Sequence, residues 1–180
     1  MTKSCRIELR LQEVSHVFDP LDASPLVERD LNRRVEEFIV ESLKELDTKN
    51  LCEIVLHFDQ SKTIADEEQV VARAIRGYFV RRAKVLQYKL HTLIRRGIIS
   101  LVIGVAFLVL FFLSGRMLVH LMGENAFTTL LTESLIIGGW VAMWRPLEIF
   151  LYDWWPILGE RRLYDRISRI PVSVAYDETR

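Results

Sequence analysis

Residues 98–113, IISLVIGVAFLVLFFL, decide the fold of this chain, because the whole stretch of sixteen residues carries no charge. A helix that spans a bilayer needs about 20 mostly apolar residues. The stretch reaches that length when Gly97 and the following residues 114–118 are included. We therefore predict a transmembrane helix here.

A second apolar segment follows the first after a short connection. It reads LLTESLIIGGWVAMW at 130–144 and continues into RPLEIFLYDWWPIL at 145–158. The connection, residues 114–129, carries only Arg116, His120 and Glu124 as ionisable side chains. Two spans joined in this way predict a multi-pass membrane protein built on a two-helix hairpin.

The charges on either side of the hairpin are unevenly distributed. The chain has 24 basic and 24 acidic side chains, but residues 73–96 hold eight Lys or Arg and no Asp or Glu. Cytoplasmic flanks of membrane helices carry the excess of Lys and Arg, so we expect both termini in the cytoplasm. Basic flanks against a membrane favour anionic lipid headgroups over nucleic acid as their partner. The expected lipid-facing basic residues are Arg81, Arg82, Arg95, Arg96, Arg161 and Arg162.

The N-terminal region predicts a small domain of strands and a helix. Apolar and polar residues alternate over 5–12 and over 51–58, as in half-buried strands. Apolar residues recur at helical spacing over 30–46 between them. This order predicts a parallel βαβ unit with a right-handed crossover. Because two strands form a thin core, we expect this layer to pack on another helix or another subunit.

The region between this domain and the hairpin predicts one long helix. Only Gly77 weakens the helical pattern before Arg96, at a cost of about 1 kcal/mol relative to Ala, so the helix is expected to continue into the first apolar stretch. The predicted fold class is an α+β membrane protein. Its expected parts are a cytoplasmic βαβ-type domain at 1–62, a basic connecting helix at 63–96, a transmembrane hairpin with an interfacial aromatic segment at 97–156, and a cytoplasmic basic tail at 157–180.

Small residues mark the sides on which the two membrane helices are expected to pack. Gly97 and Gly104 lie along one side of the first helix, and Gly138 and Gly139 share a side of the second. Small residues allow helix backbones to approach closely in a bilayer, where no hydrophobic force drives the helices together. We favour packing within one hairpin, and contacts between copies are the alternative.

The segment Trp144–Pro156 is the most unusual part of the hairpin. Because Pro146 cannot donate to the carbonyl of Ala142, we expect the helix to kink or restart there. Arg145 and Glu148 are three residues apart and can pair on one helix face. Ionisable groups at membrane depth suggest a functional site. The candidates are Arg145, Glu148, Asp153 and, near the opposite headgroups, Glu133.

Aromatic side chains in the same segment favour an interfacial position instead. Trp144, Tyr152, Trp154 and Trp155 are typical of the belts that lie at headgroup level. On this interpretation Arg145 snorkels to the interface and the acids face water. We favour this structural role over a path for transport, and both positions, within the bilayer or at its cytoplasmic face, stay open.

The soluble region contains no recognisable catalytic or metal-binding motif. Cys5 and Cys52 fall in the part assigned to the cytoplasm, where thiols stay reduced. The sequence lacks the C-x-x-C or H-x-x-x-H spacing of a zinc site, and it lacks a nucleophile elbow, a P-loop and a dinucleotide fingerprint. We therefore predict no catalytic residues, no metal and no cofactor.

Two phrases of the sequence resemble those of a family of small, uncharacterised bacterial two-helix membrane proteins. They are LDASPLVERDLN at 21–32, with the pattern LDxSPxxERDL, and GGWVAMWRPLEIFLYDWWP at 138–156. In that family a short soluble region precedes a two-helix hairpin. The resemblance implies a location in the bacterial inner membrane and no particular activity.

Three functions are compatible with these features. The first, which we expect, is a non-enzymatic membrane interaction or assembly module that forms a homo-oligomer or binds a protein partner, and no nucleic acid. The second is an oligomeric channel or transporter component that uses the intramembrane Glu, Arg and Asp, which requires several copies because two helices cannot enclose a pore. The third is a subunit of a membrane enzyme complex.

Overall fold

The computed structural model describes residues 5–45, 52–59 and 67–176. Its contacts divide the chain into two compact units. The sheet unit consists of residues 1–85 and 160–180, and the hairpin unit consists of residues 86–159. The hairpin unit is therefore an insertion in the chain of the sheet unit. The predicted boundary between residues 62 and 63 lies outside the described residues.

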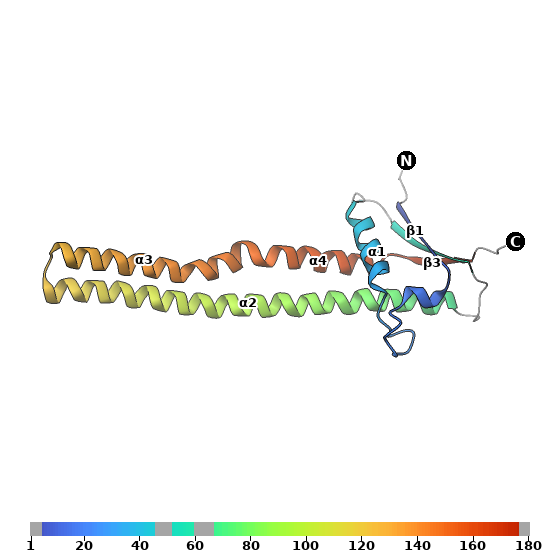
Figure 1. The fold of residues 1–180 in the computed structure, drawn as a ribbon, viewed down its shortest axis with the longest axis horizontal. Helices are drawn as coiled ribbons and strands as arrows, with labels where there is room; N and C mark the ends of the chain where they lie inside the picture. Colours follow the sequence, from blue (N-terminus) through green and yellow to red (C-terminus); the bar gives the residue numbers. More distant parts are fainter. Residues whose placement is uncertain (1–4, 46–51, 60–66, 177–180) are drawn as a thin grey trace. The chain divides into compact units, whose positions relative to one another are not determined.

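The sheet unit is built on three parallel strands, β1 (Cys5–Leu11), β2 (Cys52–Phe58) and β3 (Val172–Tyr176), in the order β1-β2-β3 (Figure 1). The parallel pairing of β1 with β2 confirms the predicted βαβ arrangement. β3 corrects the prediction of a basic tail after residue 157, because this region adds a third strand beside β2. A parallel partner so distant in the chain leaves no local signal in the sequence.

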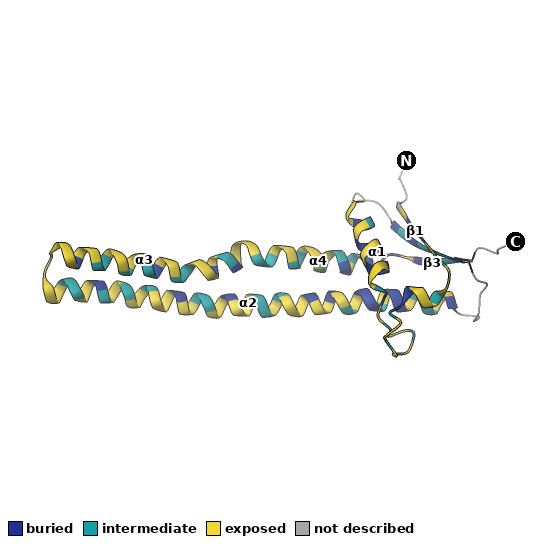
Figure 2. Ribbon diagram, viewed as in Figure 1, coloured by how far each residue is buried: buried dark blue, intermediate teal, exposed yellow. Residues whose placement is uncertain are grey.

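Helical segments cover one face of this sheet. They are α1 (Arg33–Glu45), the first turns of α2 (Glu67–Met122) and the end of α4 (Trp154–Ile167). Right-handed crossovers between sequential parallel strands place their helices on the same side. Accordingly, every second residue of β2 is buried, whereas the residues between them are only half-buried (Figure 2). The core includes Phe18, Ile39, Leu43, Ile54, Leu56, Phe58, Ile75, Phe79 and Ile167.

Cys52 departs from the expectation of a reduced thiol. It is buried, with 7% of its surface exposed, and it is disulfide-bonded. The residue opposite Cys52 in the parallel register is Cys5. The prediction of a reduced thiol is therefore wrong for Cys52.

Each leg of the hairpin is nearly continuous helix. α2 runs without interruption through Gly77 and Gly97, as predicted, and it belongs to both units. The second leg consists of α3 (Ala126–Glu148), the π-helical turn η2 (Ile149–Asp153) and the start of α4. By length and composition both legs are able to cross a membrane, and only 11% of the most apolar part of each is buried.

The connection between the legs is much shorter than the expected loop at 114–129, because only residues 123–125 lie outside helix. Gly123 has a φ of 74°, a left-handed conformation that ends α2. Asn125 caps α3: its side chain accepts hydrogen bonds from the backbone N–H groups of Phe127 and Thr128. Thr128 in turn accepts from the backbone of Asn125. These caps allow the polar residues on either side to remain helical.

Candidate functional site

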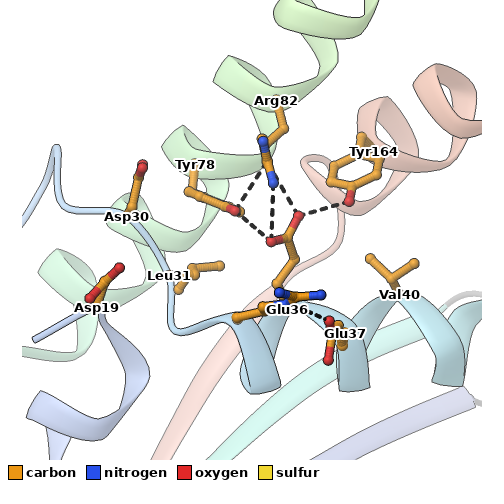
Figure 3. A pocket seen from close by; sticks show the side chains of 10 residues that line it. Asp19, Asp30, Leu31, Glu36, Glu37, Val40, Tyr78, Arg82 and Tyr164 are labelled. Carbon is orange, nitrogen blue, oxygen red and sulfur yellow. Dashed lines mark hydrogen bonds and ion pairs between the residues drawn. The ribbon is translucent and has the colours of Figure 1, made fainter. Parts of the chain in front are cut away.

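The most connected polar group of the sheet unit is the carboxylate of Glu36, on α1. Only 7% of Glu36 is exposed. It accepts hydrogen bonds of 2.7 Å from the hydroxyls of both Tyr78, on α2, and Tyr164, on α4 (Figure 3). Arg82 donates to the same carboxylate from Nε at 3.3 Å and from Nη2 at 3.4 Å. We call these four residues the Glu36 cluster, and they join three helices.

The local sequence explains how the cluster forms. Glu36 lies between Val35 and Ile39 on the buried face of α1, so helix packing carries the carboxylate inward. Tyr78 and Arg82 are four residues apart on α2 and therefore share a face. The Arg82 guanidinium donates to the Tyr78 hydroxyl at 3.1 Å and lies 5.7 Å from the centre of its ring. A buried carboxylate requires such partners to offset the loss of hydration.

The electrostatics of the cluster fix the protonation state of each group. Burial raises the pKa of Glu36, but the hydrogen bonds from Tyr78, Tyr164 and Arg82 and the charge of Arg82 outweigh burial and hold the pKa below its ordinary value. Burial, followed by the hydrogen bond to the Glu36 carboxylate, raises the pKa of both Tyr78 and Tyr164. At neutral pH the carboxylate is charged and the phenols are neutral. The cluster therefore has a structural role, because neither the Glu36 carboxylate nor the two phenols change protonation state near neutral pH.

A pocket of about 490 Å³ opens beside the Glu36 cluster. Besides the residues of the Glu36 cluster, the pocket is lined by Asp19, Asp30, Arg33 and Glu37. Arg33 and Glu37 form an ion pair of 2.7 Å (Figure 3). Among the described residues there is no group of three or more His, Cys, Asp or Glu placed to hold a metal ion. The pocket is a polar surface depression without a metal-ligand set in the described part of the chain.

The hairpin unit brings together three of the four predicted membrane residues. Arg145 Nη1 lies 2.8 Å from Oε2 of Glu148 and 3.7 Å from Oδ2 of Asp153. A π-helical turn has wider i→i+5 bonding than an α-helix, and η2 shortens the axial separation between Arg145 and Asp153. Glu133 is exposed and makes no hydrogen bond or ion pair with the residues that the structure describes.

The helix does not restart at Pro146, which was one of the two outcomes expected there. α3 continues through Pro146 to Glu148, and the irregularity follows as the π turn. Because Pro146 has no N–H, the carbonyl of Ala142 lacks its usual i→i+4 donor. A Cβ built on Gly104 of α2 would lie 3.0 Å from that carbonyl oxygen. The opposite leg therefore lies close to the backbone at the point where the proline frees a carbonyl.

The other predicted glycines also lie where the two legs of the hairpin meet. A Cβ on Gly97 would lie 2.9 Å from the side chain of Ile149, and one on Gly139 would lie 3.3 Å from the Cα of Leu108. A Cβ on Gly138 would lie 3.2 Å from the ring of Phe111. The structure adds Gly115 to the predicted positions, since a Cβ on Gly115 would lie 2.9 Å from the side chain of Thr132.

The predicted aromatic residues are mostly exposed. Trp144, Tyr152 and Trp155 have exposed fractions of 72%, 70% and 64%. Trp154 is half-buried, and its indole N–H donates to the carbonyl of Phe150 at 2.8 Å. Exposed aromatic rings on an apolar hairpin are typical of a membrane interface.

The structure divides the predicted lipid-facing arginines into two groups. Arg82 belongs to the Glu36 cluster, and Arg81 donates to the carbonyl of Glu28 at 2.8 Å and lies 3.5 Å from the Asp30 carboxylate. These two side chains therefore serve the fold of the sheet unit. The remaining residues, Arg95, Arg96, Arg161 and Arg162, make no ion pair within the described ranges, and Arg161 alone among them is half-buried.

The Glu36 cluster has no motif in the sequence. Glu36 occupies a position on the apolar face of an otherwise amphipathic helix, and this is the one signal that marks it. Comparison with protein-family models, with curated proteins and with solved structures finds no match to this chain. The candidate sites of this chain are therefore defined by its own residues and their contacts.

Proposed function

We propose that this chain is an integral protein of the bacterial inner membrane, with both termini in the cytoplasm and a non-enzymatic interaction or assembly role. The length and apolar composition of the two legs and the basic residues beside them support the membrane location. The resemblance of its two sequence phrases to small bacterial hairpin proteins supports it further. Arg95, Arg96 and Arg162 are exposed and suit contacts with anionic headgroups.

The observation that carries the interaction role is the half-covered parallel sheet. All-parallel sheets occur almost only with both faces covered, yet Glu53, Val55 and His57 lie on a face that no described helix covers. The Nε2 atom of His57 is buried and has no hydrogen-bond partner among the described residues. A protein surface laid on this face, from a second copy or another protein, would cover the sheet.

Cross-linking and native mass spectrometry of the full chain in nanodiscs test this role. We expect an oligomer or a co-purifying protein, and we expect Val55→Lys on the open face to weaken the association. Glu41→Lys, an exposed position on α1, is the matched control and should leave it intact. A strictly monomeric protein without a co-purifying partner contradicts the proposal.

The orientation is tested by labelling introduced cysteines with a membrane-impermeant maleimide in intact cells. A cysteine at Glu124, in the connection between the legs, should react from outside, and one at Glu41 should react only after permeabilisation. The disulfide of Cys52 is the feature that favours the reverse orientation, since disulfides persist in oxidising compartments. Labelling at Glu41 in intact cells would establish that reverse orientation.

A channel or transport role is the second candidate, favoured by the Arg145, Glu148 and Asp153 network at the π turn. π turns occur frequently at functional sites. Ion flux into liposomes should be measured for the wild-type chain and for Glu148→Gln. Flux that the substitution changes supports this role, and no flux or identical flux contradicts it.

A further inference from the structure

β3 forms one edge of the sheet and has no partner strand on its outer side among the described residues. The N–H of Ile54 donates to the carbonyl of Pro171 at 3.0 Å, and Ile54 lies opposite Val172 in the register. Backbone groups of successive residues alternate between the two sides of a strand. The N–H and C=O groups of Val172, Val174 and Tyr176 therefore point outward, away from β2.

The two edges of the sheet differ in how they are protected. β1 carries the exposed charged side chains Arg6, Glu8 and Arg10, which discourage pairing with another strand. β3 has the sequence VSVAY, with no charge and no proline. Proteins usually protect a free edge with charges, prolines or covering elements. The unprotected edge of β3 is therefore suited to receive another strand.

A groove of about 610 Å³ lies next to this edge. Val172 of β3 lines it together with a stripe on α2 whose members follow helical spacing. Ala72 and Gly77 in this stripe are small and leave room for another backbone. The stripe includes Gln69, Ala72, Arg73, Arg76 and Val80.

Two arginines give the groove its charge. Arg73 and Arg76 are exposed, and neither makes a hydrogen bond or an ion pair with the residues that the structure describes. Among the described residues of the lining, Glu68 is the one that is acidic. Unpaired guanidinium groups bind carboxylates through two parallel hydrogen bonds. The groove is therefore complementary to an acidic ligand.

We propose that an extended acidic segment of a partner protein binds in this groove and adds to β3 as a fourth strand. Strand addition to a sheet edge obtains affinity from main-chain hydrogen bonds and specificity from the flanking side chains. The outward backbone of Val172 and Val174 supplies the hydrogen bonds, and Arg73 and Arg76 select acidic side chains. This inference rests on the proposed interaction role and names the site and the chemistry of the partner.

Fluorescence anisotropy on the full chain in nanodiscs tests the groove. The probe is a fluorescein-labelled ten-residue peptide of alternating valine and glutamate, and the control peptide has lysine in place of glutamate. We expect saturable binding of the glutamate peptide alone, weakened at least tenfold by Arg73→Glu combined with Arg76→Glu. The matched control, Arg34→Glu on the exposed side of α1, should leave binding unchanged.

A second pair of measurements tests strand addition itself. Val174→Pro removes an outward N–H without touching the ladder to β2, and proline is tolerated on sheet edges, so it should weaken peptide binding while the chain stays folded. In the unmodified chain the peptide should slow hydrogen exchange of the Val172, Val174 and Tyr176 amides. Unchanged exchange at these three amides on peptide binding overturns strand addition.

Other outcomes reject the groove. Equal binding of both peptides, or of neither, contradicts the assignment, and binding of the arginine stripe to phosphatidylglycerol vesicles alone would make it a lipid contact. An oligomer or co-purifying protein that persists in the double arginine variant, together with no peptide binding, would leave the interaction role standing and reject this site. If the unmodified chain forms no oligomer and has no co-purifying protein, the interaction role itself is rejected.

Discussion

Tyr164 donates its hydroxyl to Oε1 of Glu36 at 2.7 Å, across 128 positions of the sequence. Tyr78 donates to Oε2 of the same carboxylate, also at 2.7 Å. Tyr78 precedes the hairpin in the chain and Tyr164 follows it. One buried carboxylate on α1 thus holds both helical segments through which the chain leaves and re-enters the sheet unit.

Removal of one of these hydroxyls should loosen the sheet unit. Tyr164→Phe keeps the ring, which lies 5.7 Å from Phe79, and deletes a hydrogen bond to a charged group worth about 1.5–3 kcal/mol. Hydrogen exchange of the β3 amides should accelerate accordingly. The control is Tyr152→Phe, whose side chain is 70% exposed. Equal exchange rates in the two variants would contradict a role for the cluster in stability.

The stability of the sheet unit should fall at both ends of the pH range. The pKa of Glu36 is below its ordinary value of 4.5 in the folded chain, so its contribution is present above that value and disappears as the pH falls through the folded pKa. The pKa values of Tyr78 and Tyr164 are raised above 10.0. Their contribution is present below pH 10 and is lost as the pH rises towards the folded pKa values.

Urea denaturation at a series of pH values, followed by far-ultraviolet circular dichroism, measures this dependence. Glu36→Gln should remove most of the decline on the acid side, and Tyr78→Phe should reduce the decline on the alkaline side. A pH profile that neither substitution changes would show that other groups control it.

The close approach at Gly104 should make that position intolerant of a larger side chain. The Cβ of Gly104→Ala would lie 3.0 Å from a backbone oxygen of Ala142, which cannot rotate away. Gly159→Ala is the matched control, because its Cβ would have no atom within 4 Å. Thermal unfolding in detergent should separate the two variants, with the lower midpoint for Gly104→Ala. Identical unfolding midpoints in the two variants would contradict a close contact between Gly104 and Ala142.

The cap of α3 should also be measurable. Asn125→Ala removes the acceptor for the N–H groups of Phe127 and Thr128, at a cost of about 1 kcal/mol. Faster hydrogen exchange is expected in the first turn of α3. Ser134→Ala is the control, since the Ser134 hydroxyl donates only to the carbonyl of Leu130 in its own helix. Similar exchange in both variants would argue against the cap.

Sequence patterns predict the parts of this fold that have a local cause. Alternation predicts β1 and β2, and helical spacing with a single glycine predicts the unbroken α2. In the hairpin, small residues predict four of the positions where the legs meet. The sequence signal for each of these features lies in residues only a few positions apart.

Features with a non-local cause are not predictable in this way. β3 is a strand because β2 offers it an edge, and Glu36 is a site because Tyr78 and Tyr164 reach it from distant helices. The π turn after Pro146 is a third case, since the sequence marks the proline but not how the helix adjusts to it. The tertiary contacts decide these outcomes.

The position of the hairpin between β2 and β3 sets the order in which the protein can mature. During synthesis β1, α1 and β2 emerge first, but the third strand and Tyr164 emerge only after both legs of the hairpin. Until then β2 has an unpaired edge and Glu36 lacks one of its partners. The sheet unit can therefore be completed only after the entire hairpin has been synthesised. A chain truncated within the hairpin lacks β3 and exposes an incomplete sheet to quality-control proteases.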